Sequence, residues 1–354
     1  MSSRRMAMHL GWQLSTGFNF KCRWSVRGQP GTWGAILMLP LVFAMLFTDR
    51  ADAQKGDRPF LIGALTSSWG TTPMIAGLRD GLIELGYREE VDFTLGVRFT
   101  QGDLSELPAA ARQLVAYGAD LIFVDDDTAA RAARQATAKI PIVFASVSEP
   151  LALGSIDSFA RPGGNVTGVT DLELKLGPKR LQVFQEIIPG LKRVLFVYDA
   201  AQDTSVRMAA AYREAARHLG ITLIEKSVRT QKEAGTVFEQ VQATDIDGIL
   251  TSASVSLNIW GFAAETSLQK KIPAMFSSSF APEGGALVSY ATNTRETGKQ
   301  AARLVDKIFK GTKPAELPVE VNTKLELVIN LKTAAALGLT IPPEMLYRAD
   351  RLIR

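Results

Sequence analysis

From residue 58 onward, short runs of apolar residues alternate with stretches that have helical periodicity. Residues 60–65 (FLIGAL), 121–124 (LIFV) and 140–145 (IPIVFA) are strand-like runs rich in Val, Ile and Phe, and polar turns and helical patterns separate them. Strands that are apolar on both faces are typical of parallel sheets covered by helices on both sides. The pattern therefore predicts an α/β fold built on parallel sheets.

The same series of elements occurs twice. Residues 194–197 (VLFV) begin the second series, and the helical stretch after them ends at Leu219 and Gly220, as an earlier one ends at Leu85 and Gly86. Each series continues with a strand, a polar loop, a helix and a strand that starts with Ile-Pro. This shared order predicts two similar, doubly wound parallel-sheet lobes with a hinge and a central cleft, although any two α/β stretches look somewhat alike. We expect lobe 1 to comprise residues 58–168 and about 285–322, and lobe 2 to comprise residues 169–284 and about 323–354.

The first 53 residues have the pattern of a secretory signal peptide. Residues 1–32 contain five Lys and Arg and no acidic residue, residues 33–47 (WGAILMLPLVFAMLF) are uncharged, and Ala51-Asp52-Ala53 follows. A basic segment, an apolar segment and a small-residue cleavage site are the parts of such a leader. A permanent membrane anchor is the alternative, but the apolar run is shorter than the ~20 residues that a spanning helix needs. We predict cleavage after Ala53 and export to the periplasm.

The leader accounts for the basic charge of the chain. The 354 residues include 40 Lys and Arg and 36 Asp and Glu, which gives a formal net charge of +4. Six of the basic and two of the acidic residues lie in residues 1–53, so the rest of the chain carries 34 of each. The single cysteine, Cys22, also lies in the leader. A neutral, cysteine-free chain suits an oxidising compartment and gives no support to a nucleic-acid partner.

The sequence gives little sign of catalysis. No serine lies in a G-x-S-x-G turn, and neither of the common glycine-rich nucleotide motifs follows a strand. His218 falls in the last turn of a helical stretch, where a histidine more often interacts with the helix dipole than acts as a base. We therefore expect no metal, no cofactor and no enzymatic activity. The remaining enzyme hypothesis rests on a carboxylate pair, Asp125 with Asp199 across the cleft.

Six loops that follow the expected strands are rich in Ser, Thr, Asp and Asn. They are residues 66–72, 125–128 and 146–149 in lobe 1, and residues 199–205, 251–258 and 277–280 in lobe 2. Ligands of open parallel sheets bind beyond the carboxyl ends of the strands, so two facing sets of such loops predict a polar cleft with aromatic walls. The candidate ligand-binding residues are Ser67, Ser68, Trp69, Asp125, Asp127, Thr128, Ser146, Glu149, Thr170, Asp199, Thr204, Ser252, Ser254, Ser278 and Tyr290.

The acidic run at residues 125–127 has two interpretations. In the first, Asp127 or Thr128 caps the following helix and the neighbouring carboxylates are merely solvated. In the second, a carboxylate at the end of a strand binds a ligand ammonium group. Trp69, in a loop beside a glycine, is a candidate for stacking on a ligand, whereas Trp260 is expected to begin a helix and to pack.

Five segments carry a resemblance to a known family. They are residues 141–150 (PIVFASVSEP), 161–170 (RPGGNVTGVT), 176–180 (LGPKR), 284–290 (GGALVSY) and 325–342 (LELVINLKTAAALGLTIP). On these segments the chain resembles the ABC-transporter substrate-binding proteins sometimes described as tryptophan/tyrosine transport components. The resemblance spans roughly residues 58–354. It implies a type I periplasmic-binding fold with two lobes that close on a small molecule. We also expect a monomeric protein and an ABC permease in the inner membrane as its partner.

Three segments on the expected cleft depart from the usual pattern of that family. Residues 148–150 (SEP) stand where Gly-Asp-Pro is common, residues 199–201 (DAA) replace an Asn-Pro pair, and residues 125–127 are more acidic than usual. An additional carboxylate favours an amine-bearing or cationic ligand. We expect the periplasmic substrate-binding component of an ABC importer, which traps a small polar or aromatic, amino-acid-like solute. The alternative is an envelope ligand-sensing domain of a signalling system, because the same fold serves in receptors and repressors.

Overall fold

The computed structural model describes residues 58–354, apart from residues 152–153, 155, 172 and 252–256. The expected signal peptide, residues 1–53, lies outside the described residues. No helix in the described part of the chain combines the length and the apolar character that crossing a membrane requires.

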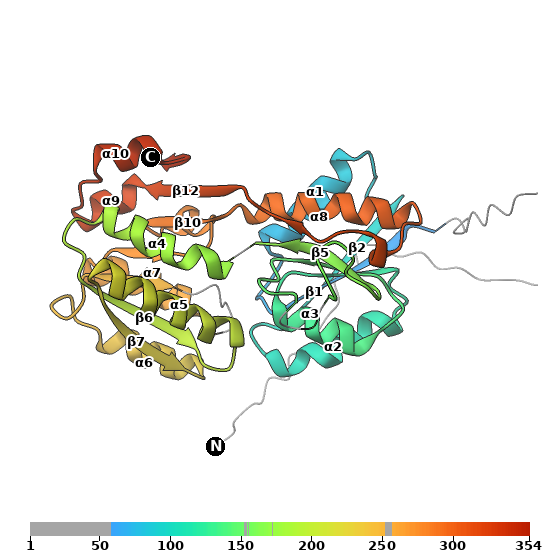
Figure 1. Ribbon diagram of the computed structural model, residues 1–354, viewed down its shortest axis with the longest axis horizontal. Coiled ribbons are helices and arrows are strands. Elements are labelled where there is room, and N and C mark those ends of the chain that lie inside the picture. Colours follow the sequence, from blue (N-terminus) through green and yellow to red (C-terminus); the bar gives the residue numbers. More distant parts are fainter. Residues whose placement is uncertain (1–57, 152–153, 155, 172, 252–256) are drawn as a thin grey trace, which may run out of the picture. The chain divides into compact units, whose positions relative to one another are not determined.

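The first sheet is entirely parallel and forms the centre of lobe 1. Its strands in the described residues are β1 (Phe60–Thr66), β2 (Phe93–Phe99), β3 (Leu121–Val124), β4 (Ile142–Ala145), β5 (Val166–Thr170) and β11 (Glu320–Val321), in the order β11-β5-β4-β3-β1-β2. Helices α1 (Pro73–Glu84) and α8 (Thr294–Phe309) cover one face, and α2 (Leu107–Ala116) and α3 (Asp127–Ala136) cover the other (Figure 1). Short 3-10 helices lie at Leu104–Glu106 and Pro314–Glu316.

The second sheet forms the centre of lobe 2. Its described strands are β6 (Arg193–Asp199), β7 (Thr222–Val228), β8 (Gly248–Thr251), β9 (Ala274–Phe276), β10 (Val288–Thr292), β12 (Leu325–Asn330) and β13 (Arg351–Ile353), in the order β13-β12-β10-β9-β8-β6-β7. One face packs on α4 (Glu173–Ile187), α5 (Asp203–Leu219), α9 (Leu331–Leu337) and α10 (Pro343–Arg348). The other face packs on α6 (Gln231–Gln240) and α7 (Ile259–Lys270), and a 3-10 helix at Ala281–Gly284 precedes β10.

The α/β class and the internal repeat that the sequence predicts are confirmed. The strand order β4-β3-β1-β2 of the first sheet recurs as β9-β8-β6-β7 in the second. Gly86 and Gly220 follow α1 and α5, the helices after the first strand of each series, with φ values of 93° and 67°, a left-handed conformation that favours glycine and ends a helix. The two lobes are therefore built from the same series of elements.

The second sheet differs from the expectation in two ways. Strand β12 pairs antiparallel with β10, whereas the sequence predicts parallel strands alone. Strand β10 also lies between β9 and β12, so residues 288–292 belong to lobe 2, although we expected residues 285–322 to belong to lobe 1. In the first sheet, β5 extends lobe 1 to Thr170, beyond the expected boundary at residue 168. The chain leaves β10 for lobe 1 and returns directly through β12, and two neighbouring strands connected in this way run in opposite directions.

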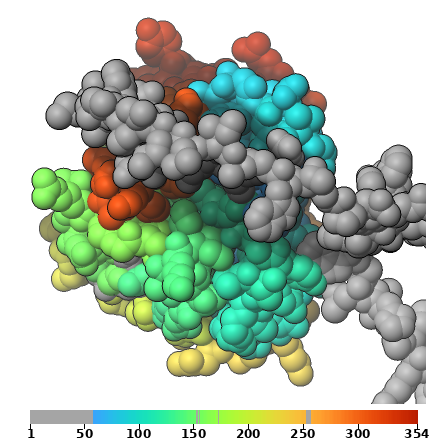
Figure 2. Space-filling view, turned by 90° about the vertical axis from the view of Figure 1, so that its right-hand side faces the viewer, coloured from blue at the N-terminus to red at the C-terminus, as the bar shows by residue number. Residues whose placement is uncertain are grey.

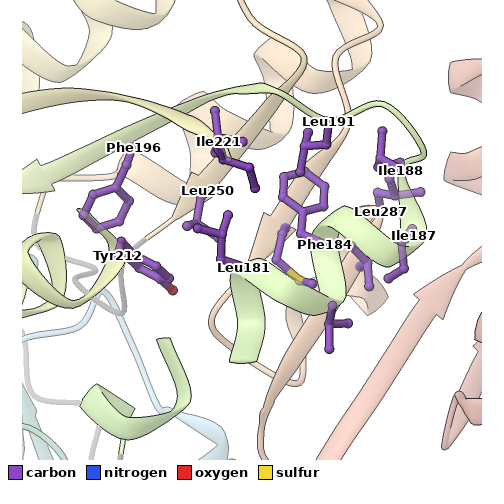
Figure 3. Packing of buried hydrophobic residues seen from close by; sticks show 14 of the residues in the cluster. Leu181, Phe184, Ile187, Ile188, Leu191, Phe196, Tyr212, Ile221, Leu250 and Leu287 are labelled. Carbon is purple, nitrogen blue, oxygen red and sulfur yellow. The ribbon is translucent and has the colours of Figure 1, made fainter. Parts of the chain in front are cut away.

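Alternate residues of the central strands face opposite helical layers. Ile62 of β1 packs in the cluster with α1 and α8, while Leu65 of the same strand packs with α2 and α3. In lobe 2, Phe184 of α4 and Leu250 of β8 belong to one buried cluster, in which Phe196 of β6 lies beside Tyr212 of α5 (Figure 3). Each sheet is therefore buried on both faces, and this packing fixes the positions of the strand ends within each lobe.

The chain passes between the lobes three times, and Asn322 joins described residues of the three crossings. Asn322 is 4% exposed. Its backbone N donates to the carbonyl oxygen of Thr170 at 2.8 Å, and its Nδ2 donates to that of Asn293 at 3.2 Å. The backbone N of Asn293 in turn donates to the carbonyl oxygen of Lys324 at 3.1 Å. These hydrogen bonds connect the three crossings into one hinge.

Helix α8 returns to lobe 1 from the C-terminal half of the chain and crosses α1 at very short distance. In the space-filling view, orange residues of this returning part lie beside green residues of the first half (Figure 2), and Val319 donates to the carbonyl oxygen of Phe159. At the helix crossing, a Cβ atom built on Gly298 would lie 2.0 Å from the carbonyl oxygen of Met74, and one on Gly77 would lie 2.0 Å from that of Arg295. Glycine is therefore required at the crossing.

We predict that Gly298→Ala lowers the free energy of unfolding by about 1–3 kcal/mol, because the added methyl group forces α1 and α8 apart. Urea unfolding of the ligand-free protein measures the loss. Gly284→Ala is the control, since a Cβ atom there meets nothing within 4 Å, and it should change stability by less than about 0.5 kcal/mol. Equal losses at the two positions would contradict the close crossing.

Candidate functional site

A cavity of about 540 Å³ lies between the two lobes, at the carboxyl ends of their strands. Lobe 1 contributes the segments that follow β1, β3 and β4, and lobe 2 contributes the first turns of α5 and α7 and the segment after β9. The volume falls within the range of about 300–1,000 Å³ that small-molecule sites occupy. We call this space the interlobe cavity.

The structure brings most of the sequence-selected candidates together in the interlobe cavity. Nine of the fifteen line it, namely Ser67, Ser68, Trp69, Asp125, Asp127, Thr128, Ser146, Thr204 and Ser278. Ser252 and Ser254 lie outside the described residues. The other four candidates do not line the cavity.

Each of those four has a different structural position. Glu149 forms an ion pair with Arg207, which joins the lobes outside the cavity. Thr170 is fully buried at the end of β5 and donates to the carbonyl oxygen of Ser148 at 3.5 Å, while Asp199 accepts from the backbone N of Ala201 at 2.8 Å. Tyr290 packs at the edge of the lobe 2 core. Because Asp199 does not share the cavity with Asp125, the geometry gives no support to catalysis by that carboxylate pair.

Sequence reasoning missed several residues that line the cavity. Asp171 directly follows β5, so the rule of strand carboxyl ends would have selected it, but residues 166–170 are not among the strand-like runs identified in the sequence. Arg131 and Met208 lie inside α3 and α5, where no loop pattern marks them. Trp260 both packs and lines the cavity, with its ring centroid 5.3 Å from that of Phe280.

Asp125 is the most unusual side chain of the cavity. It follows β3 and is 5% exposed. Its Oδ2 accepts a hydrogen bond of 2.5 Å from Thr72 Oγ1, and Thr72 also caps α1 by accepting from the backbone N of Ile75 at 3.3 Å. Its Oδ1 has no hydrogen-bond partner among the described residues. A buried polar atom without a partner is costly, so a ligand donor that reaches the carboxylate of Asp125 would stabilise it.

The next two aspartates have separate tasks. Asp126 caps α3, because its Oδ1 accepts from the backbone N of Ala129 at 2.7 Å, and its Oδ2 accepts from Ser67 Oγ at 2.8 Å. The helix cap is therefore Asp126, and the first interpretation of the acidic run, in which Asp127 or Thr128 caps α3, is wrong. Asp127 accepts from the backbone N of Ser148 at 3.2 Å and also from the hydroxyl of Thr204, which belongs to lobe 2. Asp127 therefore connects the two lobes at the cavity wall.

Burial raises the pKa of two of these carboxyl groups. The pKa of Asp125 rises to about 7, chiefly through burial and further through the charge of Asp126, while the hydrogen bond from Thr72 acts in the opposite direction. The pKa of Asp127 rises to about 6, again chiefly through burial, although the hydrogen bond from Thr204 lowers it. No cation offsets either carboxylate among the described residues close enough to form an ion pair. Both groups therefore take up protons near neutral pH.

Glu173 also lines the cavity, but its charge is neutralised. Its two carboxylate oxygens accept hydrogen bonds of 2.8 Å each from Nη1 and Nη2 of Arg180, which is fully buried. Arg180 also donates from Nη1 to the hydroxyl of Tyr212 at 2.8 Å and from Nε to the carbonyl oxygen of Tyr290 at 2.9 Å. The guanidinium group thus fixes the start of α4 against α5 and β10.

On the lobe 2 side, the interlobe cavity is lined by serines whose hydroxyl groups lack hydrogen-bond partners among the described residues. Ser277 and Ser278 follow β9 and are 7% and 5% exposed, and their Oγ atoms form no hydrogen bond among the described residues. Across the cavity, Ser146 follows β4 with a left-handed φ of 59°, which few residues other than glycine adopt. Within the described residues, no group of His, Cys, Asp and Glu side chains is arranged to hold a metal ion. The arrangement suits hydrogen bonding to a small polar molecule.

Comparison with known proteins gives one family. Residues 65–353 match the family model described as ABC transporter substrate binding protein. The chain is similar to a Tyrosine-binding protein from Clostridioides difficile (strain R20291), with 24% identity over 264 residues, which cover 74% of this chain and 76% of that protein.

Solved structures show the same fold. A conserved domain protein from Vibrio cholerae is 27% identical with a TM-score of 0.75, and the match covers 83% of this chain and 99% of that one. An ABC domain from Streptococcus pneumoniae in complex with L-Trp is 24% identical with a TM-score of 0.73, covering 83% of this chain and all of that one. These likenesses confirm the two-lobed, type I periplasmic-binding fold.

We predict that the stability of the ligand-free protein falls as the pH rises from about 4 to about 7. The pKa of Asp125 is higher in the folded than in the unfolded chain, so the folded state retains the proton over this range, and each such group changes the free energy of unfolding by at most about 1.4 kcal/mol per pH unit. Asp125→Asn should remove much of this slope and make the protein more stable than the wild type at pH 8.

Urea unfolding at several pH values measures this difference. Asp245→Asn is the matched control, because Asp245 is exposed and lies outside the cavity. If the profiles of the wild type and Asp125→Asn run parallel, the raised pKa of Asp125 is wrong.

We predict that Arg180→Met lowers the free energy of unfolding by about 3–5 kcal/mol, because it leaves Glu173 buried without its cation. Arg207→Met is the control. It breaks the ion pair with Glu149, whose partners are 44% and 40% exposed, and should cost less than about 1 kcal/mol. Similar losses in urea unfolding would show that burial does not distinguish the two pairs.

Proposed function

Because the chain belongs to the ABC transporter substrate-binding protein family, we propose that it is the periplasmic solute receptor of an ABC importer. In this role it binds a small polar or aromatic, amino-acid-like solute between its lobes and presents it to a permease in the inner membrane. The family is one of binding proteins rather than enzymes. The proposed role accordingly involves no cofactor and leaves the solute chemically unchanged.

The observation that carries the proposal is that both lobes line one cavity. A ligand that contacts Asp125 of lobe 1 and Ser277 and Ser278 of lobe 2 stabilises the closed arrangement, because only closure brings these groups to a single small molecule. The hydrogen bond from Thr204 to Asp127 and the ion pair of Arg207 with Glu149 add contacts between the lobes. Closure around the ligand then distinguishes the loaded from the empty receptor.

Two further observations support the ligand class and the compartment. Trp69, Trp260 and Phe280 line the cavity and offer faces on which an aromatic group can stack. The Tyrosine-binding relative and the L-Trp complex favour an aromatic solute. The basic and apolar segments of residues 1–47, followed by Ala51-Asp52-Ala53, support export through a cleaved signal peptide.

We predict that the protein produced without residues 1–53 shows a ligand-dependent rise in melting temperature within a panel of amino acids, amines, nucleosides and aromatic acids. A ligand at about 100 times its Kd stabilises the folded state by about 2.7 kcal/mol. If no compound of any class raises the melting temperature, the receptor function is contradicted.

Trp69→Ala tests whether the interlobe cavity is the site. Trp69 is 56% exposed, so its removal should leave the melting temperature of the ligand-free protein unchanged but reduce the rise that an aromatic ligand causes. Tyr347→Ala is the matched control, because Tyr347 is 93% exposed and lies outside the cavity. An equal response in both variants would place binding elsewhere.

A further inference from the structure

The charges that line the interlobe cavity are strongly one-sided. Once Glu173 is paired with Arg180, the described lining still contains five carboxylates, of which Asp125 and Asp171 are buried, and Arg131 is the sole lysine or arginine. Arg131 lies four residues after Asp127 on α3, on the same side of the helix, but forms no ion pair with it among the described residues. The carboxylates in this set are Asp125, Asp126, Asp127, Asp171 and Asp203. A ligand carboxylate would enter a field that repels it.

Helix N-termini, the usual alternative for holding a carboxylate, are also occupied or acidic. Helix α1 begins with Pro73, which has no N–H group, and α3 is capped by Asp126. Helix α5 begins with Asp203, and α8 is capped by the side chain of Asn293. The start of α7 at Asn258 has no side-chain cap, but a helix dipole supplies only about half a positive charge there. The cavity is therefore poorly equipped for an amino acid's carboxylate.

The same cavity is well equipped for an ammonium group. Asp125 of lobe 1 and Ser277 and Ser278 of lobe 2 line the cavity from opposite sides, and each has one buried side-chain oxygen without a hydrogen-bond partner among the described residues. An ammonium group has three N–H donors, and hydrogen bonds from it to a carboxylate are among the strongest in proteins. Trp69 and Trp260 add aromatic faces that attract a cation and can stack on a ring.

Building on the proposed function, we propose that the ligand is an aromatic amine: a small cation that carries an ammonium group and an aromatic ring but no carboxylate. The ammonium group binds Asp125, and the ring lies against the tryptophans of the cavity. An aromatic amino acid, which adds only a carboxylate to the same frame, binds more weakly because that carboxylate meets Asp126, Asp127, Asp171 and Asp203.

The proposed contact gives binding a definite pH dependence. The cation attracts only the ionised form of Asp125, whose pKa is about 7 in the ligand-free protein, so affinity should rise as the pH increases from about 5.5 to about 7.5. The charged groups that face Asp125 across the cavity are Asp126, Asp127, Asp171, Asp203 and Arg131, together with the paired Glu173. Alkyl amines titrate near pH 10, so the ligand itself stays charged over this range.

Matched pairs of ligands test the proposal by titration calorimetry on the protein without residues 1–53. The pairs are tryptamine with tryptophan and tyramine with tyrosine, measured at pH 7.5 and again at pH 5.5. We expect at least one amine to bind at least tenfold more tightly than its amino acid, and its affinity to fall at the lower pH. Asp125→Asn should weaken that amine at least tenfold and remove the pH dependence, whereas Asp245→Asn should do neither.

The outcomes separate the two levels of the proposal. Equal or tighter binding of both amino acids overturns the aromatic amine and leaves the receptor function intact. The same conclusion follows if neither amine binds while another class of compound in the panel raises the melting temperature. If the preferred amine binds Asp125→Asn as tightly as the wild type, the contact with Asp125 is overturned. If no compound of any class binds, the receptor function itself fails.

Discussion

The hydrogen bonds of Asn322 hold together the three crossings on which the site depends. Each lobe has its own sheet and its own cores, so nothing in the packing of either lobe fixes the direction in which its strands point relative to the other. By joining the crossings next to Thr170 and Asn293, Asn322 contributes to holding the carboxyl ends of both sheets at one cavity, together with the contacts of Thr204 with Asp127 and of Arg207 with Glu149. A short hinge of this kind lets the lobes move as units while the polar loops remain opposed.

The interlobe cavity contains carboxylates that are electrostatically unfavourable in the ligand-free protein. Asp125 is buried and Asp127 half-buried, and no cation pairs with either in the described residues, so desolvation raises the pKa of both and destabilises the ionised, ligand-free state. Nearby, Glu173 is buried with Arg180, a pair that holds α4, α5 and β10 in place. The chain therefore neutralises one carboxylate with its own guanidinium group and leaves Asp125 and Asp127 without a paired cation among the described residues. Polar groups that are left unpartnered at a cleft commonly mark the place where a ligand completes them.

Much of the fold and part of the site could be predicted from the sequence. The order of strands and helices could be predicted from the strand-like runs and from the glycines that end helices. Both signals depend only on residues that are close together in the sequence. The selection of Ser67, Asp125 and Ser278 followed from one rule about strand ends. The rule failed for Glu149 and Asp199, although both follow their strands as expected. Glu149 forms an ion pair with Arg207, and Asp199 accepts a hydrogen bond from a backbone amide. It also could not reach Arg131 and Met208, because helix packing aims those side chains at the cavity.

The sequence by itself determined the α/β class, the two related lobes and the edge of each sheet where polar residues gather, since these depend on the period of apolar residues and on short-range caps. Only the tertiary structure decided that β12 runs antiparallel to β10, that Asp126 rather than Asp127 caps α3, and that Arg180 neutralises Glu173 but not Asp125. These outcomes depend on which segments meet after the chain has passed between the lobes three times. Charge pairing in particular acts through space, so the net charge of a cavity is set only when both lobes enclose it.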